Sequence, residues 1–146
     1  MDRSIALAAD VDADQTRVAG VLSSTEGQRA FWTEDSDVFA DHARFGFAEA
    51  PVDLETTVHV EANKIVRMRV TSGFPYWTGS TWEWELSGAT RTGSGTSVLF
   101  RHYGFGEGYP ELDMAHTAQT WALILDRLVR YIATGDPQPL FTMAAQ

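Results

Sequence analysis

Residues 113–134 read DMAHTAQTWALILDRLVRYIAT and are followed by Gly135. The apolar residues of this stretch recur at alternating steps of four and three: Met114, Ala118, Trp121, Leu125, Leu128 and Ile132. On a helix of 3.6 residues per turn, this spacing forms one apolar stripe. Pro110 before the stretch and Gly135 after it are typical of helix boundaries. The sequence therefore predicts a helix about 33 Å long that buries one side along its length.

The segment between residues 38 and 105 has the period of two that is typical of strands. Five sets of residues each share a face: Phe45 and Phe47; Thr56, Val58 and Val60; Val66, Met68 and Val70; Trp82 and Trp84; Val98, Phe100 and His102. Short turns separate successive strands, which favours an antiparallel sheet with one packed face and one wet face. Glu83 and Glu85 alternate with the tryptophans and are expected to face solvent.

The N-terminal part is predicted to add one strand and two short helices. Residues 4–11 alternate as a strand, and Asp12 with Gln15 has the pattern of a capping box that opens a helix. A second capping pattern begins at Thr25, and its helix ends near Trp32. The predicted fold is α+β, with about six to seven antiparallel strands curved around a long C-terminal helix. Residues 1–146 are expected to form one domain in which residues 136–146 are a tail.

Composition narrows the classes of partner. The net charge is −9, and one lysine stands against ten arginines, so nucleic acid and anionic membrane surfaces are expected to be repelled. No apolar run approaches the roughly 20 residues that a membrane span needs, and the chain holds no cysteine. A cytoplasmic protein without membrane or nucleic-acid partners is the expectation, and a homodimer is left open.

A curved sheet that wraps around one helix is expected to leave space between the two. The predicted lining of this cavity is Trp32, Phe45, Phe47, Val58, Met68, Trp82, Trp84, Phe100, His102 and Trp121. The alternative is that the rings fill the space and form an ordinary core, as aromatic residues usually do.

His102 carries the chemical hypothesis. Its parity with Val98 and Phe100 directs it toward the long helix. There it acts either as a polar group that orients a ligand or moves a proton, or as a core histidine hydrogen-bonded to the backbone. The other histidines show no zinc-type spacing, and residues 104–108 do not fit a phosphate-binding loop. Residues 104–108 are interpreted instead as a flexible loop that gates the cavity. We therefore expect no metal and no cofactor, and we assign no catalytic residue.

The ordered landmarks resemble the START-like superfamily, which is also called the helix-grip or SRPBCC fold. Within it, the chain looks most similar to homologues of the activator of heat shock protein 90 ATPase, grouped with polyketide cyclase-like proteins. The matching landmarks are the helix at residues 12–21, the segment 27–32, Gly95-Thr96, the segment 102–105, and Trp121, Leu125, Leu128 and Tyr131 before Gly135.

The resemblance implies binding of lipids, sterols, polyketides or other apolar molecules between sheet and helix. The first expectation is therefore a binding protein for a small apolar or aromatic ligand. Because some members of the superfamily are cyclases or hydrolases, an enzyme that uses a polar residue of the cavity is the first alternative. A co-chaperone-like protein-interaction module is the second, and the sequence leaves open whether the protein turns over a substrate.

Overall fold

The computed structural model describes residues 3–143, which contain seven strands and three helices. In chain order these are β1 (Ser4–Val11), α1 (Gln15–Leu22), α2 (Thr25–Phe31), β2 (Asp35–Val38), β3 (His42–Gly46), β4 (Leu54–Glu61), β5 (Ile65–Ser72), β6 (Thr81–Ser87), β7 (Thr96–Tyr103) and α3 (Glu111–Thr134). This order confirms the predicted one.

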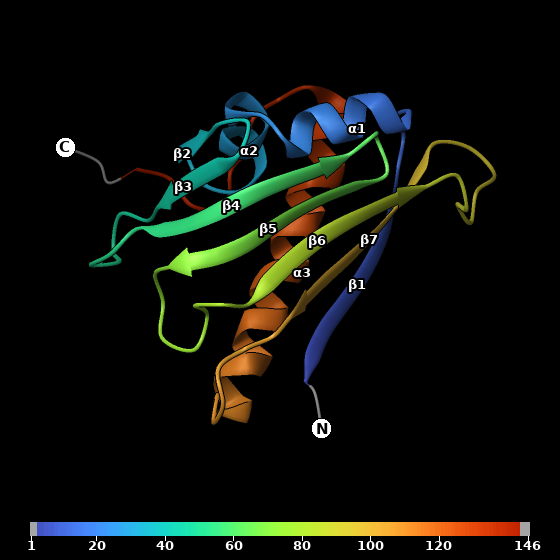
Figure 1. Cartoon of the computed structure of the whole chain (residues 1–146). Coiled ribbons are helices and arrows are strands. Elements are labelled where there is room, and N and C mark those ends of the chain that lie inside the picture. The colour runs from blue at the N-terminus through green and yellow to red at the C-terminus, as the bar shows by residue number, and fades with distance from the viewer. Residues whose placement is uncertain (1–2, 144–146) are drawn as a thin grey trace.

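All seven strands form one antiparallel sheet in the order β1-β7-β6-β5-β4-β3-β2. The sheet is curved, and α3 crosses its concave face while α1 and α2 lie together at one end (Figure 1). The predicted α+β fold, a curved sheet around a long C-terminal helix, is confirmed. No helix in residues 3–143 is both long and apolar enough to cross a membrane.

Helix α3 follows the predicted stripe closely. It begins at Glu111, two residues before the predicted start, and Pro110 is its N-cap residue. Its buried residues are Trp121, Ile124, Leu125, Leu128 and Ile132. Gly135 ends the helix with φ 76°, a left-handed conformation that glycine adopts without a steric penalty. The helix therefore presents one apolar side to the sheet over its C-terminal half.

The inner face of the sheet is built from the alternating residues of the central strands. Met68 on β5 stands opposite Trp82 on β6, and Trp82 stands opposite His102 on β7. Trp84 and Phe100 form the next cross-strand pair. All five side chains are buried, so the predicted direction of each is confirmed.

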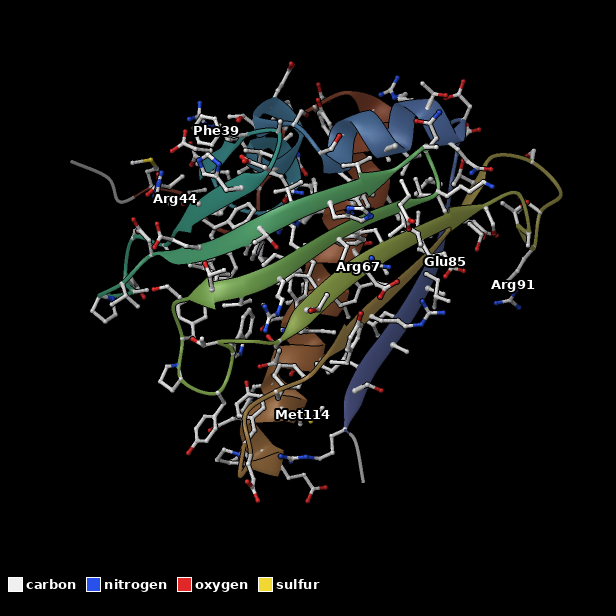
Figure 2. All side chains as sticks on the ribbon, viewed as in Figure 1. Phe39, Arg44, Arg67, Glu85, Arg91 and Met114 are labelled. Carbon is white, nitrogen blue, oxygen red and sulfur yellow. The ribbon has the colours of Figure 1, made fainter. Side chains whose placement is uncertain are left out.

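Glu83 corrects the expectation that it faces solvent. It does lie on the outer face of the sheet, but only 7% of it is exposed. Its cross-strand neighbours are Arg67 on β5 and Arg101 on β7, whose guanidinium nitrogens approach the carboxylate to 3.8 and 3.6 Å. Tyr103 donates a hydrogen bond to it at 2.8 Å. Long neighbouring side chains thus cover the carboxylate of Glu83. Glu85 pairs with Arg101 at 3.2 Å and remains more exposed, on the face turned away from α3 (Figure 2).

The caps of the two short helices also differ from the predicted ones. Asp14, not Asp12, is the N-cap of α1 and accepts a hydrogen bond from the backbone N–H of Arg17 at 2.8 Å. Since Val11 still pairs with β7, two more residues are needed to turn the chain into the helix. In α2 the cap is Ser24, one residue before the predicted Thr25.

Candidate functional site

A pocket of about 830 Å³ opens between α3 and one end of the sheet. We call it the aromatic pocket. Its walls come from five separate parts of the chain: Trp32 after α2, residues 47–50 after β3, the loop after β5, one side of α3, and residues 140–143. Six aromatic side chains line it, namely Trp32, Phe47, Phe74, Trp77, Trp121 and Phe141, together with the polar residues Glu49, His116, Thr117, Thr120 and Thr142.

The floor of the aromatic pocket rests on a dense cluster of rings. Trp32 and Trp121 have ring centroids 5.3 Å apart. On the side away from the pocket, Trp32 contacts Phe45 at 4.5 Å, and Trp121 contacts Phe100 at 4.4 Å and Trp82 at 5.3 Å. Aromatic contacts of this kind add to the free energy of burial and restrict ring rotation. The two pocket indoles are therefore held rigidly in place.

The loop after β5 forms a second wall and is tied to α3. The ring of Trp77 packs on Phe74 at 5.2 Å. The indole N–H of Trp77 donates to the hydroxyl of Tyr109 at 3.2 Å, and that hydroxyl lies 2.7 Å from the hydroxyl of Thr117 on α3. The backbone of Gly106 also donates to the carbonyl of Tyr76 at 2.7 Å. The glycine-containing loop is thus bonded to a pocket wall, and its gating role stays a prediction.

The C-terminal segment forms the third wall. The backbone N–H of Phe141 donates to the carbonyl of Trp32 at 2.8 Å, and Glu34 donates back to the carbonyl of Phe141 at 3.0 Å. The ring of Phe141 packs edge-on against Phe47 at 5.1 Å. Leu140 and Phe141 therefore pack back onto the fold. Residues 144–146 of the predicted tail lie outside the described residues.

His102 lies behind the pocket and is fully buried. Its Nδ1 accepts a hydrogen bond from the indole N–H of Trp121 at 3.1 Å, so the proton of the neutral ring is on Nε2, which lies 2.9 Å from the hydroxyl of Ser80. Burial lowers the pKa of His102 to about 3, because the charged imidazolium would lose its hydration. His102 is thus a neutral core histidine bonded to two side chains rather than to the backbone.

The ten residues predicted to line a cavity fall into three groups. Trp32, Phe47 and Trp121 line the aromatic pocket. Phe45, Met68, Trp82, Trp84, Phe100 and His102 are buried in the ring cluster and are not part of the pocket lining. Val58 is half-buried on β4, outside the lining. That a ligand contacts any of the ten residues stays a prediction.

Several lining residues were not predicted from the sequence. Ile124 follows Trp121 by three residues, so helical spacing alone was a signal for it. Phe74 and Trp77 lie in a loop without periodicity, and residues 48–50 follow a strand end. No local pattern distinguishes such residues from an ordinary loop. Within residues 3–143, no group of three or more histidine, cysteine, aspartate or glutamate side chains is placed to hold a metal ion.

The arrangement of a curved antiparallel sheet around a long C-terminal helix is a helix-grip fold. No family model matches the sequence, and no curated protein matches it. Solved structures do match. The Aha1 dimer from Colwellia psychrerythraea has a TM-score of 0.76 at 22% identity, over 91% of this chain and 98% of that one.

Two further structures share the fold. CalU16 from Micromonospora echinospora has a TM-score of 0.67 at 19% identity, over 94% of this chain and 78% of that one. DynU16, a protein of the dynemicin biosynthetic locus, has a TM-score of 0.74 at 18% identity. The match covers 97% of this chain but only 51% of DynU16. At these identities the likeness establishes the fold alone.

Proposed function

We propose that this protein binds a small apolar or aromatic molecule in the aromatic pocket. The observation that carries the proposal is an open volume of about 830 Å³ with six aromatic side chains in its lining. Pockets that bind small molecules usually enclose about 300–1,000 Å³ and combine apolar walls with a few polar groups. Thr117, Thr120 and Thr142 supply hydroxyl groups among the rings.

The expected affinity follows from the area that a ligand buries. An aromatic ligand that removes about 200 Å² of apolar surface from water gains about 5 kcal/mol. Association costs at least about 4 kcal/mol in lost translation and rotation. Apolar burial alone therefore supports weak binding, and a larger ligand or hydrogen bonds to the threonine hydroxyls are needed for micromolar affinity.

The geometry of His102 favours binding over turnover. Both ring nitrogens already have partners, and the pKa of about 3 keeps the ring neutral. A cyclase- or hydrolase-like reaction would require a different acid or base. The co-chaperone-like alternative draws support only from the fold shared with Aha1. Because that Aha1 structure is a dimer, a homodimer is retained as a proposal for this chain. A cytoplasmic location is also retained as a proposal.

A pocket-filling variant tests the function directly. We expect Thr120→Phe, which places a ring in the pocket from α3, to weaken binding of the fluorescent probe 1-pyrenemethanol at least tenfold. Gln119→Phe is the matched control, since Gln119 is exposed on the same helix and lies outside the lining. Circular dichroism checks that both variants are folded. Equal probe affinity in the two variants would show that the pocket is not the binding site.

Native mass spectrometry of gently purified protein complements this test. A small molecule that co-purifies with the wild type, and is lost from Thr120→Phe but kept by Gln119→Phe, would identify the natural ligand.

A further inference from the structure

We propose that the aromatic pocket selects neutral or cationic aromatic ligands and rejects anionic ones. This inference rests on the proposed ligand binding and adds the chemical class of the ligand. The inference is argued from the acidic side chain in the pocket walls and from the lack of basic side chains among the described lining residues.

Among the residues that the structure describes, no lysine or arginine belongs to the pocket lining. Among the described lining residues, Glu49 is the one acidic side chain and His116 the one histidine. A carboxylate or phosphate that enters the pocket would lose hydration without gaining a counter-charge. Desolvation of an unpaired anion is costly, so such a ligand would bind more weakly than its neutral analogue.

Arginines close to the lining in sequence are bonded to other groups. Arg29 and Arg44 both donate to Asp37, at 3.1 and 2.7 Å. Arg127 follows the lining part of α3 and donates to the carbonyl of Gln138 at 3.0 Å. To serve an anionic ligand, each guanidinium would have to give up these bonds. These three arginines therefore form no preorganised anion site beside the rings.

The rings and the acidic surroundings favour positive charge. The faces of indole and phenyl rings carry a negative electrostatic potential that attracts ammonium groups, most strongly for tryptophan. Trp32, Trp77 and Trp121 all contribute to the lining, and Glu49 adds a carboxylate among the wall residues. The net charge of −9 extends this preference beyond the pocket, since it attracts cations and repels anions on approach.

Three pyrene derivatives that differ in one group test the selectivity: 1-pyrenemethylamine, 1-pyrenemethanol and 1-pyrenecarboxylic acid. Dissociation constants are measured by fluorescence titration at pH 8 and 0.15 M NaCl, where the three are cationic, neutral and anionic. We expect the amine and the alcohol to bind at least tenfold more tightly than the acid.

Glu49→Gln separates the contribution of the pocket carboxylate. We expect this variant to narrow the ratio between amine and acid affinities two- to fivefold, which is typical for one exposed charge. Glu61→Gln removes the same charge at the end of β4, outside the lining, and should leave the ratio within about 1.5-fold of the wild type. An equal effect of the two variants would mean that net charge alone sets the preference and would overturn the assignment to the pocket.

The remaining outcomes distinguish the two proposals. If the acid binds as tightly as the amine and the alcohol, the selectivity is refuted while ligand binding stands. If none of the three probes binds, the proposed function fails for ligands of this size, and the selectivity fails with it.

Discussion

A buried neutral histidine makes the stability of this protein depend on pH in a way that one variant can isolate. The pKa of His102 is lowered to about 3 by burial, whereas a histidine in an unfolded chain has a pKa near 6.5. Below pH 6.5 the unfolded chain takes up a proton that the folded chain does not. The stabilisation that comes from the neutral ring is therefore complete above pH 6.5 and is lost as the pH falls toward 3.

The magnitude follows from the two pKa values. Each pH unit between them is worth about 1.4 kcal/mol, so the loss from pH 6.5 to pH 5 is about 2 kcal/mol. His102→Gln removes the titration and retains a side chain that can both donate and accept in place of the imidazole. We expect the difference in free energy of unfolding between wild type and His102→Gln to decrease by about 2 kcal/mol from pH 8 to pH 5.

Urea unfolding followed by tryptophan fluorescence measures this difference at both pH values. Other groups also titrate, such as Asp37, whose pKa is lowered by its hydrogen bond to Arg44. Their effects are common to both proteins and cancel in the comparison. His59→Gln is the surface control, and we expect it to change stability by less than about 0.5 kcal/mol at each pH, since the ring is exposed. A difference between wild type and His102→Gln that does not vary with pH would refute the idea that burial keeps His102 neutral.

Two further predictions concern stability, each with a matched control. Glu83→Gln is expected to lower the free energy of unfolding by about 1–3 kcal/mol, because it removes the charge of a nearly buried hydrogen-bonded carboxylate, whereas Glu85→Gln should cost less than about 0.5 kcal/mol. Equal losses in chemical denaturation would show that burial of Glu83 does not matter. Gly27→Ala is expected to destabilise the protein by more than about 2 kcal/mol, since the added methyl would lie 1.8 Å from the carbonyl oxygen of Val21. At Gly20 an added methyl would meet no atom within 4 Å, so Gly20→Ala should instead raise the melting temperature, because alanine favours the helix by about 0.5–1 kcal/mol. A higher melting temperature for Gly27→Ala as well would contradict the close packing of α1 on α2.

The elements were largely predictable because their signals are local. The stripe along α3 and the alternation in β5, β6 and β7 arise from the geometry of single elements, and a buried face needs apolar residues at that period. The inward direction of Trp82 and of His102 followed from the same parity. Helix caps were less predictable, because Asp12 and Asp14 offer equivalent side chains and pairing of β1 with β7 decides between them.

The candidate site was predicted only in part. Trp32, Phe47 and Trp121 were expected at a ligand cavity and line the aromatic pocket. Trp84 and Phe100 are chemically similar, yet they lie outside the pocket lining and pack against each other with ring centroids 4.7 Å apart. Nothing in the local pattern separates a ring that faces an opening from a ring that faces another ring. Similarly, the hydrogen-bond partners of His102 are Ser80 and Trp121, which are distant from it in sequence.

The sequence by itself thus determined the order of elements, the faces of the strands and the buried side of α3, since periodicity depends on backbone geometry that each element carries alone. Only the tertiary structure decided where the pocket opens and which side chains line it. That outcome depends on how closely residues 47–50, the loop after β5, α3 and residues 140–143 approach one another. Distances between segments so far apart along the chain are set by the packing of the whole core, and no short stretch of sequence encodes them.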